Sequence, residues 1–202
     1  MSKVIVVANL KGGTGKTMCS VQLAGVLAEC KPTLLVDADP QGSALKWAEL
    51  VDLPFPVAGL PSRTIHRQLA SLATGRDRVV IDTPPGQIAI VASALQVADL
   101  VLVPVQPATG DLAQLAETAQ LVDDAQASRA TTFAVRWVLT RALARTRARR
   151  DSREVFEADG LPLLQTEIPQ AQALALAFGQ PLDPHPSYRQ LAAELAEQGL
   201  LR

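Results

Sequence analysis

The chain has 202 residues, of which 48% are apolar and 19% are charged, and its net charge is −1. This length is enough for one α/β domain with its core and too short for two domains of typical size. The composition excludes a disordered chain, and the near-neutral charge excludes a generally polybasic or polyacidic protein.

Short apolar runs alternate with longer amphipathic stretches along the whole chain. The apolar runs predict strands at residues 3–9, 33–37, 78–82, 99–103, 133–139 and 163–168, with a weaker one at 55–58. The amphipathic stretches predict helices at residues 17–30, 41–50, 63–74, 87–97, 110–127, 144–158 and 187–198. Several strands are apolar on both faces, which is typical of a parallel sheet covered by helices. We therefore expect an α/β fold, a single three-layer, doubly wound domain over residues 1–202 with a mostly parallel sheet.

A glycine-rich stretch lies between the first predicted strand and the first predicted helix, and it reads Gly12-Gly13-Thr14-Gly15-Lys16-Thr17. Glycines permit the positive φ angles that turn successive backbone N–H groups inward around phosphate oxygens. The helix that follows directs its first N–H groups at the same anion. We expect Lys16 to reach the β- and γ-phosphates of a nucleotide, and the Thr17 hydroxyl to bind Mg²⁺.

Two further predicted strands end in aspartates. Residues 33–37 run into Asp37-Ala38-Asp39-Pro40-Gln41-Gly42, and residues 78–82 run into Asp82-Thr83-Pro84-Pro85-Gly86. Ligands bind at the carboxyl ends of strands in open α/β sheets. Because Asp37 and Asp39 are two residues apart, they cannot face the same way in an extended chain. One is expected to face the metal or the loop and the other the γ-phosphate, while Asp82 has the Walker B arrangement that holds Mg²⁺ through a water molecule.

A second lysine, Lys11, opens the loop, which therefore reads Lys-Gly-Gly-Thr-Gly-Lys-Thr. Together with the two aspartate motifs, this sequence resembles the deviant Walker A ATPases of the MinD/ParA group, and the small ParA partition ATPases over nearly the whole chain. The resemblance implies a P-loop ATPase that uses ATP and Mg²⁺. It implies that Lys11 reaches the nucleotide of the other subunit in a dimer, that Asp39 orients or activates the attacking water, and that Asp37 supports the Mg²⁺ shell. Met18, where many relatives carry a second threonine, implies modestly weaker nucleotide affinity.

The base is predicted to be adenine. GTPases carry an [NT]KxD motif after a late strand, and the corresponding place here, Thr140-Arg141-Ala142-Leu143, lacks both the lysine and the aspartate. In ParA-like proteins the adenine also meets the loop after the next strand. The resemblance therefore assigns Thr140, Arg141, Pro169 and Gln170 to the base.

An arginine-rich segment suggests a second activity. Residues 129–153 carry eight arginines against the single acid Asp151, a net charge of +7, so the remainder of the −1 chain carries −8. In the helix predicted at 144–158, Ala144, Ala148 and Val155 share one face. We assign contact with DNA phosphates, without base readout, to the arginines on the remaining surface, which are Arg145, Arg147, Arg149, Arg150 and Arg153. The alternative is a solvated helix face.

The resemblance also implies how the activities combine. Small ParA proteins dimerise on ATP, bind DNA without sequence preference and are released when a ParB-like centromere-binding partner stimulates hydrolysis. The chain starts at its first strand, so we expect no N-terminal helix-turn-helix. We expect a cytoplasmic, nucleoid-associated protein, since the two cysteines form no CxxC pair and neither a signal peptide nor a membrane-spanning run is present.

Three other kinds of ATPase or nucleotide-binding protein share parts of this pattern. A MinD-like membrane ATPase needs a basic, bulky amphipathic C-terminal helix, whereas residues 187–202 place Leu191 and Leu195 beside many alanines and read as a helix packed on the domain. An iron–sulfur carrier is rejected because Cys19 and Cys30 are not placed to hold a cluster. A ParA-like ATPase that positions protein cargoes such as carboxysomes or chemoreceptor clusters stays open, because only the partner differs.

Overall fold

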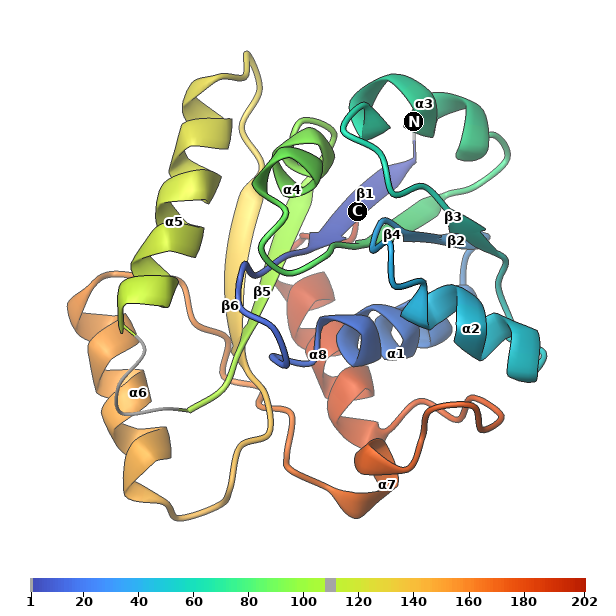
Figure 1. Cartoon of the computed structure of the whole chain (residues 1–202). Helices are drawn as coiled ribbons and strands as arrows, with labels where there is room; N and C mark the ends of the chain where they lie inside the picture. Colours follow the sequence, from blue (N-terminus) through green and yellow to red (C-terminus); the bar gives the residue numbers. More distant parts are fainter. Residues whose placement is uncertain (1, 108–111) are drawn as a thin grey trace.

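The computed structural model of the protein describes residues 2–107 and 112–202. Its strands form one six-stranded sheet in the order β3-β2-β4-β1-β5-β6, and every neighbouring pair is parallel (Figure 1). The strands are β1 (Lys3–Val7), β2 (Thr33–Asp37), β3 (Val57–Gly59), β4 (Arg78–Asp82), β5 (Leu100–Val105) and β6 (Ala134–Leu139). The helices are α1 (Lys16–Ala28), α2 (Ser43–Leu50), α3 (Ile65–Leu72), α4 (Ile88–Leu95), α5 (Leu112–Ala127), α6 (Arg147–Ala158), α7 (Gln172–Ala175) and α8 (Pro186–Glu197). The predicted doubly wound α/β fold is confirmed.

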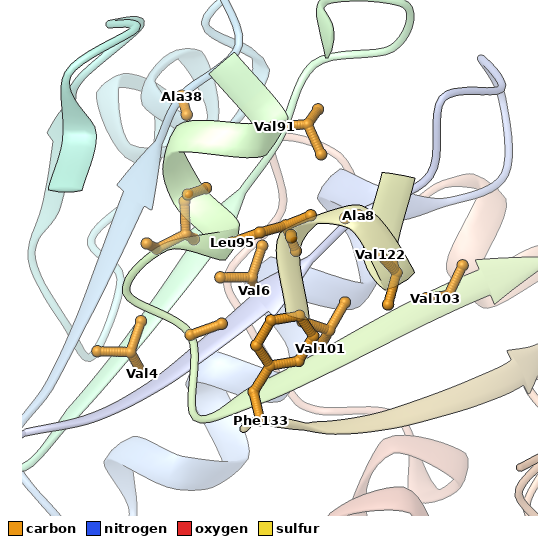
Figure 2. Packing of buried hydrophobic residues seen from close by; sticks show 14 of the residues in the cluster. Val4, Val6, Ala8, Ala38, Val91, Leu95, Val101, Val103, Val122 and Phe133 are labelled. Carbon is orange, nitrogen blue, oxygen red and sulfur yellow. The ribbon is translucent and has the colours of Figure 1, made fainter. Parts of the chain in front are cut away.

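Two apolar layers cover the sheet because successive side chains of a strand point to opposite faces. On β1, Val4 and Val6 join the core under α3, α4, α5 and α6, whereas Ile5 and Val7 join the core under α1, α2, α7 and α8. Figure 2 shows the first of these cores, where the β1 residue Val6 packs near Leu95 of α4. The double burial explains why the strands read as continuous apolar runs.

Most predicted elements lie within a few residues of the observed ones. The helix predicted at 110–127 is described from Leu112, and residues 110 and 111 lie outside the described part of the chain. The short helix α7 was not predicted, because four residues carry no helical periodicity. The C-terminal helix packs on α1 as expected, with Leu191 and Leu195 fully buried. None of the described helices combines the length and apolar character that crossing a bilayer requires.

The predicted strand at 163–168 is wrong. This segment runs beside β6, where the Leu164 and Ile168 N–H groups donate to β6 carbonyls, each at 2.8 Å, but it forms only an isolated bridge at Leu163. Between these points the N–H groups of Gln165 and Thr166 donate to the carboxylate of Glu194 on α8, at 2.9 and 2.8 Å. A side chain far along the sequence thus takes the N–H group of Thr166, which an extended strand would direct at β6.

Helix α6 differs from its prediction in both its start and its apolar face. Thr146 caps the helix by accepting a hydrogen bond from the N–H of Arg149, so Ala144 precedes the helix and cannot belong to its face. The residue that α6 buries is Phe156, which is 4% exposed and packs against Trp137 of β6 with ring centroids 5.4 Å apart. One aromatic residue therefore anchors α6 to the domain.

Phe156→Ala should lower the free energy of unfolding by about 3–5 kcal/mol, because it removes a buried ring and leaves a cavity beside Trp137. Urea unfolding followed by circular dichroism measures this change. Phe156→Leu is the control and should cost clearly less, since it keeps most of the apolar volume. A loss below about 1 kcal/mol for the alanine variant would show that α6 is held by other contacts.

Candidate nucleotide-binding site

The predicted phosphate loop joins the carboxyl end of β1 to the N-terminus of α1 (Figure 1). Gly13 and Gly15 have φ angles of 76° and 87°, in the left-handed region that side chains other than glycine rarely adopt. Gly15 is the N-cap of α1, so the loop delivers the chain directly to a helix N-terminus. Loop and helix thus present backbone donors at one edge of the sheet, as an anion site requires.

Lys16 is held inside this loop. Lys16 is only 7% exposed, and its Nζ donates a hydrogen bond to the backbone carbonyl of Lys11 at 2.8 Å. Burial lowers the pKa of Lys16, and the charges of Asp82 and Asp39 oppose this shift. The two lysines of the motif are therefore linked through the loop backbone.

Asp82 is the most strongly perturbed carboxylate of the site. It lies at the end of β4, in register with Asp37 at the end of β2, and it is fully buried. Its Oδ1 accepts a hydrogen bond from the Ser20 hydroxyl at 3.0 Å, and its Oδ2 has no partner among the described residues. Burial raises the pKa of Asp82 to about 7 and the charge of Asp37 adds to this, against the hydrogen bond from Thr17.

Asp37 has a task that the sequence did not indicate. Its Oδ2 accepts the N–H groups of Ala44 and Leu45 at 2.9 and 3.0 Å, and its Oδ1 accepts the N–H of Asp39 at 3.1 Å. These donors belong to the first turn of α2 and to the loop before it, so Asp37 caps α2 from the end of β2. Burial nevertheless raises the pKa of Asp37. The capping accounts for Asp37 without a metal, and its predicted metal and catalytic roles stay predictions.

Asp39 is half-buried and holds the turn that follows β2, where its Oδ1 accepts the N–H of Gln41 at 2.9 Å. The expectation that Asp37 and Asp39 would differ in direction fits this arrangement, because one carboxylate faces the start of α2 and the other the turn. Asp39 keeps a second carboxylate oxygen for which no hydrogen bond is recorded among the described residues.

A magnesium ion fits the chemistry of these donors. Asp82 offers a buried oxygen without a partner, and the Thr17 hydroxyl lies beside it, hydrogen-bonded to the same carboxylate. The described residues contain no cluster of three or more histidine, cysteine or acidic side chains that would cage a metal. This is the pattern expected for Mg²⁺, which takes one or two protein ligands and completes its octahedron with phosphates and water.

A pocket of about 280 Å³ opens beside Gly15. It brings together the residues predicted for the base and its surroundings, which are Met18, Thr140, Arg141, Pro169 and Gln170. Thr140 also donates its hydroxyl to the carbonyl of Thr14 at 2.8 Å and thereby fixes the pocket against the loop. The sequence missed Leu174 and Tyr188, which α7 and α8 contribute to the wall.

Two polar residues that support the loop were also missed. Asn9 is 4% exposed, and its Oδ1 accepts the N–H of Lys11 at 2.8 Å while its Nδ2 donates to Pro104 at 2.9 Å. Ser20, which orients Asp82, lies one helical turn after Lys16. Only their positions in the sequence could have indicated these two residues. A polar residue directly after a buried strand, or four residues after the loop lysine on a helix, is placed to contact the site.

The arginine-rich segment does not form one surface. Arg129 donates to the carbonyls of Leu95 and Ala98 at the end of α4, and Arg136 binds Gln198. On α6, Arg149 and Arg153 both bind Glu167, whereas Arg147 pairs with Asp151 within the helix. Arg145 and Arg150 are exposed, and no described carboxylate lies within ion-pair distance of either.

The sequence profile of the CobQ/CobB/MinD/ParA nucleotide-binding domain matches residues 5–182. The chain belongs to this family. The matched range contains the phosphate loop, all three strand-end aspartates and most of the pocket beside Gly15. The family thus accounts for the loop, the sheet and the placement of the site at its carboxyl edge.

Two curated relatives of this chain are named for the maintenance of carboxysome distribution. The maintenance of carboxysome distribution protein A of Gloeobacter kilaueensis is 47% identical over 121 residues, 57% of this chain and 55% of that protein. Its namesake from Halothiobacillus neapolitanus is 31% identical over 169 residues, 81% of this chain and 78% of that protein. The match thus spans about half the length of the first relative.

The solved structure of cobyrinic acid a,c-diamide synthase from Mycobacterium smegmatis, with a bound ATP analogue and magnesium, superposes with a TM-score of 0.80. The superposition covers 98% of this family member and 96% of that chain, at 22% identity. A likeness at this identity shows the shared fold.

Without nucleotide or Mg²⁺, stability should fall as the pH rises through about 7, because folding raises the pKa of Asp82 from about 3.9 to about 7. The folded chain holds this proton more tightly than the unfolded chain, so the contribution is favourable at low pH and is lost above pH 7. Asp82→Asn cannot titrate and should lose less stability between pH 5 and pH 8. Urea unfolding at several pH values tests this.

Asp52→Asn, at an exposed aspartate, is the matched control for this experiment and should follow the unmodified chain. Equal pH dependence of the unmodified chain and Asp82→Asn would contradict the assignment of the titration to Asp82.

Proposed function

We propose that the protein is a Mg²⁺-dependent ATPase that dimerises when it binds ATP. The ATP-bound dimer binds DNA and thereby positions a cargo. The observation that carries this proposal is the loop after β1, where Lys11 and Lys16 are joined by a hydrogen bond of 2.8 Å beside the unpartnered oxygen of Asp82. The loop supplies positive charge and backbone donors for phosphates, and the carboxylate supplies a ligand for the metal that accompanies them.

Each residue of the site has a separate task in this proposal. The loop N–H groups and Lys16 bind the β- and γ-phosphates and stabilise the charge that develops on them. Thr17 and Asp82 hold Mg²⁺, which neutralises phosphate charge when bound. Asp39, at the exposed side of the β2 turn, orients the attacking water through its remaining oxygen. Lys11 stabilises the transferred phosphoryl group in the partner subunit, as the resemblance implies.

ATP is favoured over GTP. The pocket beside Gly15 is lined by Met18, Leu174 and Tyr188, which offer apolar contact to a base, and by Thr140 and Arg141. The guanine-specific lysine and aspartate are missing from the segment after β6. The magnesium- and ATP-analogue-bound relative with this fold supports the same cofactors.

The DNA surface is proposed on α6 and the loop before it. Arg145 and Arg150 are exposed, and Arg147 is held only by an exposed pair within the helix. Guanidinium groups on such a face bind phosphates of any sequence. ATP-dependent dimerisation would double these contacts on one assembly, which places the ATP-bound protein on the nucleoid.

The cargo has two candidates. The two relatives named for carboxysome distribution favour a protein cargo. Relatives named for chromosome partitioning favour a DNA cargo, for which the resemblance implies a centromere-binding partner. A gene for a small basic centromere-binding protein next to this one would support DNA, and microcompartment shell genes would support the protein cargo. The two candidates are distinguished by testing whether the purified protein encoded by the neighbouring gene stimulates ATP hydrolysis.

Lys16→Ala should weaken Mg-ATP binding by about 100-fold or more, because it removes the charge-assisted bonds to the phosphates. Lys11→Ala should keep ATP binding within a few-fold and prevent the ATP-dependent dimer. Calorimetry measures binding, and sedimentation with a non-hydrolysable analogue measures dimerisation. Normal dimerisation of Lys11→Ala would refute the cross-subunit role while leaving the ATP site intact.

Arg145→Glu combined with Arg150→Glu should reduce DNA affinity at least tenfold and flatten its salt dependence, because phosphate contacts release counterions. The matched control reverses Arg63 and Arg67, two exposed arginines at α3, and should bind normally. Gel shifts with ATP, ADP and no nucleotide measure the affinity. Equal binding by both double variants, or binding that ignores nucleotide, would place the DNA surface elsewhere.

A further inference from the structure

Helix α6 lies at the edge of the molecule beyond β6, the last strand of the sheet (Figure 1). Phe156 is the one residue that the helix buries, and it lies near its C-terminal end. The part of the helix before Phe156 includes the exposed Arg147 and Arg150, and Arg149 and Arg153 join this part to Glu167 by ion pairs. We therefore expect the orientation of this part to depend on what Arg149 and Arg153 bind.

Both arginines bind one carboxylate, and we call this group the Glu167 clamp (Glu167, Arg149 and Arg153). Arg149 Nε lies 2.5 Å from Oε2 and Arg153 Nε lies 2.6 Å from Oε1 of Glu167, whose side chain is only 13% exposed. Arg153 also donates to the carbonyl of Gln165 at 2.9 Å. Two charge-assisted bonds to a largely buried carboxylate fix geometry far better than an exposed pair does.

The linking segment, residues 164–170, continues from the clamp to the base pocket. Directly after Glu167, Ile168 donates to Leu139 at 2.8 Å, and Gln170 donates to Ala142 at 3.1 Å. Ile168, Pro169 and Gln170 line the pocket beside Gly15. Glu167 is therefore adjacent in the chain to the pocket wall, while its carboxylate holds α6.

We propose that Glu167 is a positioning residue that couples occupancy of the base pocket to the orientation of α6. The inference rests on the proposed function, in which the pocket takes a nucleotide and α6 binds DNA. A base seated against Pro169 and Gln170 fixes the linking segment, the segment fixes Glu167, and the clamp fixes the arginine-bearing half of α6. Because linkage is reciprocal, DNA bound to α6 must strengthen nucleotide binding by the same factor.

The chain offers a matched control in the pair Arg147–Asp151. These residues pair at 3.3 Å within α6, with side chains 87% and 38% exposed. Among the described residues, no hydrogen bond or ion pair joins either of them to residues 164–170. Glu167→Gln and Asp151→Asn each remove one negative charge that is paired with arginines of α6. Any effect of charge alone appears in both variants, whereas the coupling is lost only with Glu167.

The first measurement uses Trp137, which packs against Phe156 of α6 and reports its position. The chain has two tryptophans, so the background is Trp47→Phe. Mg-ATP should change the emission of Trp137 in this background and in Asp151→Asn, and the change should be lost in Glu167→Gln. Calorimetry first establishes that each variant binds ATP. If Glu167→Gln does not fold, Arg149→Gln tests the same link from the helix.

The second measurement is the effect of duplex DNA on ATP affinity. DNA should raise the affinity about 5-fold or more in the unmodified chain and in Asp151→Asn, and clearly less in Glu167→Gln, where only the coupling through dimerisation remains. Equal coupling in all three, or equal loss in both variants, overturns the role of Glu167. ATP binding that is absent from the unmodified chain refutes the proposed function itself. A Trp137 response to ATP without DNA binding leaves the clamp intact and removes only the DNA surface.

Discussion

The buried carboxylate of Asp82 is the constraint around which the site is arranged. A charge without full hydrogen bonding is costly in a protein interior, and one of its oxygens has no partner among the described residues. The groups placed around it reduce this cost, since Ser20 and Thr17 donate hydrogen bonds and Lys16 supplies positive charge. The free domain thus has a buried carboxylate oxygen that a cation can bind, and a metal–nucleotide complex bound there stabilises the folded state by an amount that grows with the logarithm of its concentration relative to its Kd.

Asp37 and Asp82 show how environment separates two carboxylates that occupy matching positions. They end neighbouring parallel strands in register, and both are fully buried. Asp37 receives three backbone N–H groups, so its charge is satisfied by the helix that it caps. Asp82 receives side-chain hydroxyls only and has an oxygen to spare. The hydrogen bonds of Asp37 are thus accounted for by the backbone around α2, whereas Asp82 keeps one oxygen that a ligand can use.

The sequence predicted the features that depend on local pattern. The buried strands, the phosphate loop and the strand-end aspartates each follow from apolar runs and from the positions of glycine and charged residues. The sequence could not show that Glu194 takes the donors of residues 165 and 166 and so prevents a seventh strand. Nor could it show that Arg129 and Arg136 belong to other parts of the domain than α6. Contacts between distant segments decide these points, and a charge count along the chain does not contain them.

Under the proposed function, the Glu167 clamp limits which arginines at α6 can contact DNA. A guanidinium that binds a phosphate must be available, yet Arg149 and Arg153 already hold a carboxylate that is largely buried. Moving either arginine to DNA would remove one of the two charge-assisted bonds to this largely buried carboxylate, and a bond to a buried charge is more costly to lose than an exposed ion pair. We therefore expect Arg149 and Arg153 to orient the helix, whereas the exposed Arg145 and Arg150 are the candidates for contact with phosphates. The basic segment at α6 therefore contains two groups of arginines, those that bind the largely buried Glu167 and those that are exposed to solvent.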